Sequence, residues 1–132
     1  MIEYMGYSTE IKIPADKYKD LMAKEKVLAI VQDADRLDSI GAIGIGRAYT
    51  FGGNKNEPIY GEESLRAASQ PEFPGCCNEV SRMVGCSTMI FFNKLFHIEG
   101  RMKTVKGKQL ARARHNTMEK FIRSLKQEVI FA

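Results

Sequence analysis

Residues 30–53 of this 132-residue chain read IVQDADRLDSIGAIGIGRAYTFGG. In this stretch and just before it, apolar side chains recur mostly at steps of three and four residues, which is the period of a helix. The positions are Val27, Ile30, Val31, Ala34, Leu37, Ile45 and Ala48. They predict a main helix over residues 20–49, and the Gly52-Gly53 pair that follows is typical of a helix end.

Three glycines, Gly41, Gly44 and Gly46, lie inside the second half of this predicted helix. Each costs about 1 kcal/mol relative to alanine in a helix interior. That cost indicates close approach by a neighbouring helix or a ligand, or a break in the helix near Gly41. A nucleotide-binding loop is excluded because the order is G-x-x-G-x-G, with no preceding strand and no Gly-Lys-Ser/Thr. We favour helix packing against Gly44 and Gly46.

The rest of the chain also predicts helices. Residues 52–86 are rich in glycine and proline and predict a long irregular loop with one helical turn over residues 62–68. A second helix is expected over residues 88–99 and a last one over residues 105–130, where one stripe is apolar. The only strand signal, at residues 11–13, is too short to carry a sheet. We therefore expect an all-α fold, in a single domain over residues 1–132.

Charge is unevenly distributed along the chain, whose net charge is +4. From residue 103 onward, two acids, Glu119 and Glu128, accompany eight basic side chains: Lys103, Lys106, Lys108, Arg112, Arg114, Lys120, Arg123 and Lys126. Such a segment is typical of a nucleic-acid footprint or of a solvated helix face. We favour the solvated face, because no aromatic platform accompanies the charges.

Composition also limits where the protein works. No apolar run approaches the roughly 18 residues of a membrane span, and residues 1–12 contain no apolar signal segment. Cys76, Cys77 and Cys86 are odd in number and form no Cys-x-x-Cys pair, so we expect reduced thiols in a loop rather than a zinc site. These features favour a cytoplasmic protein without a membrane partner.

The acidic hexamer DADRLD, residues 33–38, is the candidate for chemistry. An EF-hand is excluded because Leu37 and Asp38 stand where that loop needs an oxygen ligand and a glycine. On a helix, Asp35 and Asp38 share a face, where they could bind a cation or an attacking water. The alternative is a pair of solvated acids beside Arg36. Of the two histidines, His97 and His115, neither belongs to a metal motif, and we expect His115 to be structural.

Two blocks of the chain together resemble the HD superfamily of metal-dependent phosphohydrolases. The first block is residues 30–53, and the second contains Lys94-Leu95, Met102, Thr104, Gly107-Lys108, Ala111 and Arg114-His115. The resemblance implies an HD-domain-like helical fold whose divalent metal is held by a His, a His-Asp pair and a final Asp. That final Asp corresponds to Asp35. The resemblance also implies hydrolysis of a phosphate ester, for example a nucleotide.

The His and the His-Asp pair of the family have no counterpart upstream of Asp33. We therefore expect the C-terminal portion of an HD-type hydrolase, truncated at the N-terminus and inactive as this isolated chain. In the roles that the resemblance implies, Asp35 binds the metal and Asp38 orients water. The phosphate contacts are Arg47, Lys94 and Arg114.

Two further expectations concern partners. The alternative function is a non-catalytic helical interaction module that binds nucleic acid through residues 103–126, although we expect no nucleic-acid partner. The apolar side chains Val27, Ile30, Val31 and Ile45 would lose their cover in a truncated fold, and this favours a homo-oligomer in which the main helices face each other.

Overall fold

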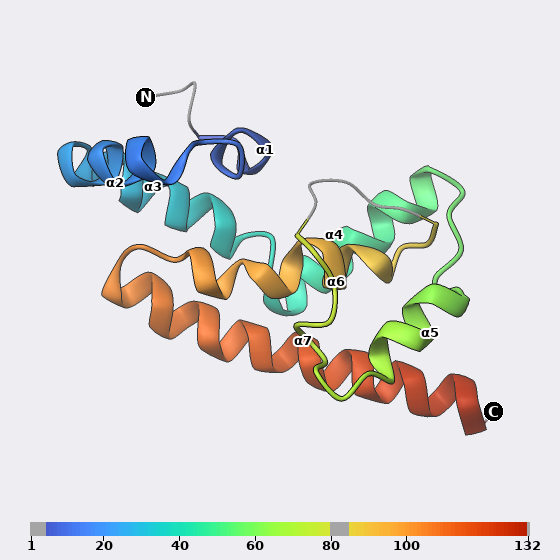
Figure 1. The fold of residues 1–132 in the computed structure, drawn as a ribbon. Helices are drawn as coiled ribbons and strands as arrows, with labels where there is room; N and C mark the ends of the chain where they lie inside the picture. The colour runs from blue at the N-terminus through green and yellow to red at the C-terminus, as the bar shows by residue number, and fades with distance from the viewer. Residues whose placement is uncertain (1–4, 80–84, 132) are drawn as a thin grey trace.

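The computed structural model describes residues 5–79 and 85–131, and these residues form only helices and their connections (Figure 1). The α-helices are α1 (Tyr7–Glu10), α2 (Ala15–Lys24), α3 (Lys26–Leu37), α4 (Gly41–Asn54), α5 (Glu62–Ala68), α6 (Met89–Asn93) and α7 (Val105–Phe131). Two short 3₁₀ helices, Leu95–His97 and Glu99–Arg101, connect α6 to α7. The all-α class predicted from the sequence is confirmed.

The predicted main helix is divided into α2, α3 and α4, so a continuous helix over residues 20–49 is wrong. The break before α4 falls at Gly41, one of the alternatives that the glycines indicated. Ile40 is extended, with φ −125° and ψ 170°, and Gly41 has φ +75°, a left-handed conformation that favours glycine. The chain turns here because Ser39 Oγ and Ser39 N both donate to the carbonyl of Arg36, at 2.7 and 3.1 Å, which ends α3.

The glycines of α4 do not pack as the sequence analysis favoured. A Cβ on Gly44 would collide with the carbonyl of Ser39 in the preceding turn, not with another helix. A Cβ on Gly46 would meet no atom within 4 Å. Gly41 is the glycine that approaches α7, where a Cβ would lie 2.9 Å from Cβ and Cγ of Arg114. The predicted helix contact at Gly44 and Gly46 is therefore wrong, and the close contact lies at the start of α4.

The long helix α7 runs along one side of the molecule, and α3, α4 and α5 pack on it (Figure 1). Its buried side chains follow the predicted stripe. α6, which the sequence predicted as part of one helix over residues 88–99, is buried on every side. Aromatic rings join the two elements: Phe91 stacks on Phe121 with centroids 6.1 Å apart, and Tyr49 of α4 contacts both rings. The core thus lies between α4, α6 and α7.

The segment between α4 and α6 matches its prediction in part. In its described residues, 55–79 and 85–88, the one α-helix is α5, which lies where the helical turn was expected. The other described residues of the segment are irregular. Within the described ranges, no helix combines the length and the apolar character needed to cross a membrane.

Candidate functional site

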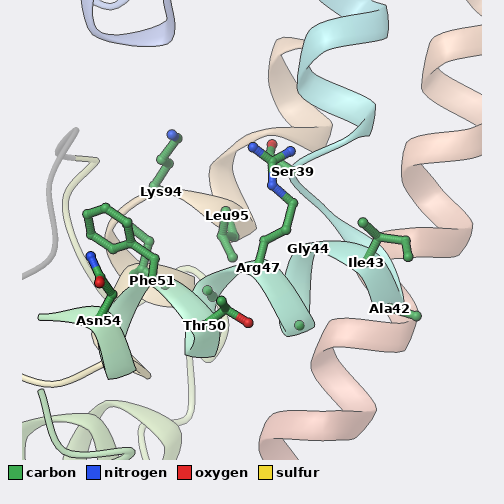
Figure 2. A pocket seen from close by; sticks show the side chains of 13 residues that line it. Ser39, Ala42, Ile43, Gly44, Arg47, Thr50, Phe51, Asn54, Lys94 and Leu95 are labelled. Atoms are coloured by element: carbon green, nitrogen blue, oxygen red, sulfur yellow. The ribbon is translucent and has the colours of Figure 1, made fainter. Parts of the chain in front are cut away.

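A groove of about 970 Å³ runs along the outward face of α4 (Figure 2). Side chains one helical turn apart on α4 form its floor, and the segment just after α6 forms its wall. Most of the lining is apolar or small: Ala42, Ile43, Gly44, Gly46, Ala48, Phe51, Ile90 and Leu95. The polar lining consists of Ser39, Thr50 and Asn54 and two cations, Arg47 and Lys94. The groove therefore offers apolar contact beside concentrated positive charge.

The two cations approach the groove from different elements. Arg47 lies on α4, and its Nη1 donates to the carbonyl of Asp38 at 3.0 Å. Among the described residues its other N–H groups have no hydrogen-bond partner, and a ligand can bind them. Lys94 follows α6 and projects on the same side of α4 (Figure 2). Its Nζ lies 4.9 Å above the ring centroid of Tyr7, a cation–π contact.

Lys94 lacks a neutralising partner among the residues that the structure describes, because no carboxylate there lies within ion-pair distance. Burial, followed by repulsion from Arg36, lowers the pKa of the Lys94 ammonium. Attraction to Asp35 raises the pKa of Lys94, and repulsion from Arg47 lowers it further. Arg36 is itself paired with Asp35 and Glu10, so the positive charge left for an anion is that of Lys94 and Arg47.

Asp35 and Asp38 lie at the end of α3, without a third metal-ligating side chain beside them in the described residues. The Asp35 side chain is 59% exposed and pairs with Nη1 of Arg36, and Asp38 is exposed. Within residues 5–79 and 85–131, no cluster of three or more His, Cys, Asp or Glu side chains could hold a metal ion. A divalent cation needs several converging oxygen or nitrogen ligands, so the described residues do not fit one.

Arg114, the third phosphate contact that the resemblance implies, lies elsewhere. Its Nη1 donates to the carbonyl of Leu37 at 2.5 Å, and its methylene carbons pack beneath Gly41. It lines a smaller cavity of about 340 Å³ with Asp38 and Thr117, which adjoins the groove at Ala42 and Ile43 near the start of α4. The structure thus brings Arg47 and Lys94 into one groove and uses Arg114 to cap α3.

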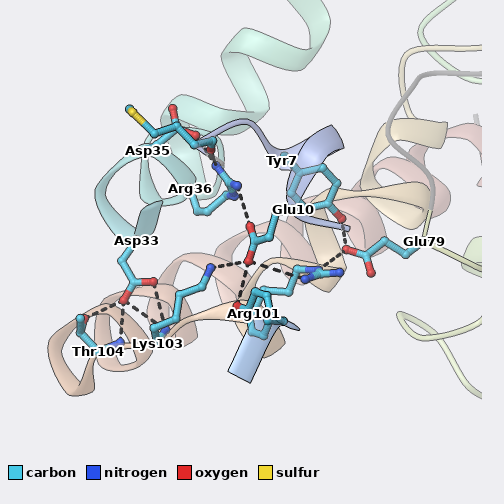
Figure 3. Close-up of polar contacts among 11 residues, drawn as sticks. Tyr7, Glu10, Asp33, Asp35, Arg36, Glu79, Arg101, Lys103 and Thr104 are labelled. Carbon is cyan, nitrogen blue, oxygen red and sulfur yellow. Dashed lines mark hydrogen bonds and ion pairs between the residues drawn. The ribbon is translucent and has the colours of Figure 1, made fainter. Parts of the chain in front are cut away.

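A buried ionic cluster surrounds Glu10, and no sequence pattern indicated it (Figure 3). The Glu10 carboxylate accepts from Arg36 Nη2 at 2.6 Å, from Lys103 Nζ at 2.5 Å and from the Tyr18 hydroxyl at 3.0 Å. Burial opposes its ionisation, but the hydrogen bonds and charges of Lys103 and Arg36 outweigh burial and hold the pKa of Glu10 below its ordinary value. The cluster fastens α1 and α2 to α3 and to the start of α7.

Asp33 was also missed as a structural residue. Its buried carboxylate accepts hydrogen bonds from the backbone N–H of Lys103 and of Thr104, at 3.0 and 2.7 Å, and from the Thr104 hydroxyl at 2.7 Å (Figure 3). The Thr104 hydroxyl in turn accepts from the backbone N–H of Gly107 at 2.9 Å, as an N-cap does. The Thr-x-x-Gly spacing was the available signal for this cap.

The two histidines have structural contacts. His97 Nε2 lies 2.8 Å from the carbonyl of Phe92. His115 is buried, as expected, with Glu119 at 3.2 Å and the ring of Phe96 at 5.4 Å.

No protein-family model matches this chain. Among curated proteins, it is 37% identical over 99 residues to the uncharacterized protein YpgQ of Bacillus subtilis (strain 168), a match that covers 75% of this chain and 38% of YpgQ. The chain thus spans well under half the length of this relative.

Solved structures of related sequence have a similar fold. A crystal structure of Bacillus subtilis YpgQ in complex with ADP is 30% identical to this chain, with a TM-score of 0.58, and covers 90% of this chain and 56% of its own. An HD-superfamily hydrolase from Bacillus thuringiensis is 32% identical, with the same TM-score and coverage. The similarity supports the helical, HD-domain-like fold that the sequence predicted.

Proposed function

We propose that the groove on α4 binds a phosphorylated small molecule, of which a nucleotide is the leading candidate. The phosphate groups contact Arg47 and Lys94, and the apolar part of the molecule lies over the floor of the groove beside Phe51. The observation that carries this proposal is the half-buried ammonium of Lys94, which lines the groove beside Arg47 and has no described carboxylate within ion-pair distance.

The side chains suit such a ligand. A guanidinium binds phosphate oxygens through paired N–H groups, and an ammonium adds a compact charge. The ring of Phe51 is 52% exposed and offers an apolar surface to a base. The ADP complex of YpgQ and the neighbouring HD-superfamily hydrolase agree with a phosphate-containing ligand.

In the wider proposal, the chain corresponds to the C-terminal, ligand-binding part of an HD-type phosphohydrolase. Asp35 would contribute one metal ligand and Asp38 would orient water. The remaining ligands that a divalent metal requires are absent from the described residues, so this chain by itself is proposed to bind its ligand without hydrolysing it.

The test is calorimetric binding of ADP to the purified chain and to three variants. We expect wild-type binding and a loss of affinity of roughly tenfold or more in Lys94→Met and in Arg47→Gln, because each removes a charged contact to phosphate. Arg66→Gln is the matched control, since Arg66 is an exposed cation on α5 that pairs with Glu62 outside the groove. Equal ADP affinity in all four proteins would place the ligand elsewhere, and no binding to wild type would reject the proposal.

Nucleic-acid binding through α7 has less support. Half of the eight basic side chains from residue 103 onward have partners within the molecule. Lys103 pairs with Glu10, Arg112 with Glu99, Arg114 caps α3, and Arg123 lies 4.7 Å above the ring of Phe73. Single-stranded nucleic acids also need aromatic rings on which the bases stack, and Phe121, the one Phe, Tyr or Trp in residues 103–126, packs on Phe91.

A further inference from the structure

Two adjacent cysteines, Cys76 and Cys77, lie in the irregular segment between α5 and α6. Successive side chains of an extended chain point to opposite sides, which separates neighbouring sulfurs. Here the backbone turns, with Gly75 N donating to the carbonyl of Glu72 at 2.8 Å, and the two Sγ atoms lie 3.7 Å apart. Both side chains are half-buried. The pair is therefore held with its sulfurs in contact and still accessible.

Two contacts hold this turn against the rest of the fold, one at Cys76 and one at Phe73. The Cys76 thiol donates to the carbonyl of Ala67 at the end of α5, at 3.3 Å. Three residues before it, the ring of Phe73 packs against Phe92 and Phe96, with centroids 5.7 and 5.5 Å apart. A ligand that needs both sulfurs would therefore find them already positioned, which reduces the entropic cost of binding.

Cys76 does not have the character of a redox-sensor cysteine. Burial, followed by the hydrogen bond with Cys77, raises the pKa of Cys76 to about 11. The Cys76 thiol therefore stays protonated at neutral pH, whereas sensor cysteines react as thiolates of low pKa. A ligand of this site must therefore displace the proton of the Cys76 thiol.

We propose that Cys76 and Cys77 form a two-sulfur binding site for a trivalent arsenical. A zinc ion would require further ligands, and no group of three or more ligating side chains exists in the described part of the chain. A linear two-coordinate ion needs sulfurs on opposite sides, whereas these two are in contact. Trivalent arsenic is pyramidal and thiophilic, and it holds two neighbouring sulfurs together with one organic group.

The reaction is a substitution without electron transfer. With an organic arsenoxide, R–As=O, two As–S bonds form and the arsenic–oxygen bond breaks. The oxygen leaves as water and takes the two thiol protons with it. Arsenic stays trivalent and the sulfurs stay at the thiol oxidation level, so no oxidant or reductant is needed.

The probe for this site is phenylarsine oxide, titrated into the full chain and followed by native mass spectrometry. We expect one phenylarsenic group per wild-type chain. In Cys76→Ser and in Cys77→Ser, the affinity should fall about a hundredfold or more, because the second As–S bond is no longer intramolecular. Cys86→Ala is the control, since Cys86 is a single buried thiol outside the pair, and it should bind as wild type does. Loss of binding in Cys86→Ala alone would overturn the assignment.

Two measurements on the wild-type chain do not depend on how the variants fold. Ethanedithiol should remove the bound arsenical at concentrations at which glutathione does not, and equal removal by both would overturn the two-sulfur site. The melting temperature should rise on binding, because the folded turn holds the sulfurs together better than the unfolded chain does. An unchanged or lower melting temperature would show that the fold does not preorganise the pair. The cysteines do not line the groove on α4, so the ADP experiment tests a separate proposal.

Discussion

At the scale of single residues, Asp33 and Asp35 have opposite environments although one residue separates them. Asp33 is buried and accepts hydrogen bonds from the start of α7, whereas Asp35 faces solvent. We expect Asp33→Ala to lower the free energy of unfolding by roughly 2–4 kcal/mol, because it removes a charged cap and leaves backbone N–H groups without their acceptor. Urea denaturation followed by circular dichroism measures this change.

Asp35→Ala is the matched control for that measurement. Its only described ion pair is with Arg36, the Asp35 side chain is 59% exposed, and Arg36 keeps its pair with Glu10, so the free energy of unfolding should change by less than about 1 kcal/mol. A larger loss in Asp35→Ala than in Asp33→Ala would contradict the assignment of Asp33 as the structural acid.

The exposed Asp35 leads to a prediction about metals. One carboxylate supplies too few ligands for a divalent cation, so the purified chain should bind neither manganese nor nickel at micromolar concentration and should show negligible phosphatase activity. Isothermal titration calorimetry measures the binding. Micromolar affinity that Asp35→Ala abolishes would show that a complete site forms around this residue.

Glu10 should make stability depend on pH in the acid range. Its pKa is lower in the folded chain than in the unfolded chain, so its contribution is fully present above the ordinary pKa of glutamate. The contribution is lost as the pH falls through the lowered pKa, because the unfolded chain takes up the proton first. We expect acid to destabilise wild type more steeply than Glu10→Gln, measured by urea denaturation at a series of pH values.

The control for this slope is Glu62→Gln, which changes a carboxylate that is 88% exposed. It should keep the wild-type acid dependence. Glu10→Gln should also be about 3–5 kcal/mol less stable at neutral pH, because Arg36 and Lys103 lose their buried counter-charge. Parallel slopes for Glu10→Gln and wild type would assign the acid sensitivity to other groups.

At the scale of elements, the sequence predicted the last helix, over residues 105–130, from a long apolar stripe that agrees with its burial. The short helix at residues 62–68 lies where one helical turn was predicted between glycines and prolines. Residues 88–99 do not form one helix, because the segment is buried on nearly every side and periodicity cannot define its bends. The turn at Gly41 depends on a left-handed backbone, which the glycine permits but does not require.

Gly41 and Gly46 test that turn as a pair. Gly41→Ala places a Cβ 2.9 Å from Arg114 in a left-handed conformation, and we expect a loss of about 1–3 kcal/mol in the free energy of unfolding. Gly46→Ala adds a Cβ where no atom lies within 4 Å, so helix propensity should raise stability by up to about 1 kcal/mol. Thermal and urea denaturation compare the two variants, and a stability loss in Gly46→Ala like that in Gly41→Ala would contradict the packing described here.

At the scale of the whole molecule, the two cations of the proposed site were named by the resemblance and not by any local pattern. Arg47 and Lys94 were proposed as phosphate contacts, and the fold places both in one groove. The cap formed by Arg114 and the cluster around Glu10 could not be predicted. Their partners come from segments far apart in sequence, and isolated charges have no period that identifies a partner.

Self-association also belongs to this scale. From the sequence we expected four apolar side chains to lack cover in a monomer: Val27, Ile30, Val31 and Ile45. In the structure two of the four are exposed and two are at least half-buried. Ile45 packs against the core and Val31 is half-buried, but Val27 and Ile30 on α3 are 57% and 60% exposed. Leaving the latter two in water forfeits roughly 1.5–3 kcal/mol each. These side chains lie one turn apart on one face of α3, so a second copy of the chain could cover them.

We therefore expect a homodimer in which the two α3 helices face each other. Light scattering across a dilution series should show a particle mass that falls toward 14.9 kDa, the mass of one chain, at low concentration. Ile30→Lys should favour the monomer at every concentration, because a charge in the contact must be desolvated without a partner. Ile59→Lys is the control, since Ile59 is 58% exposed but lies in the connection between α4 and α5, and it should leave the dimer intact. A wild-type chain that remains at 14.9 kDa at every concentration would show that the exposed face of α3 is stable in water without a partner.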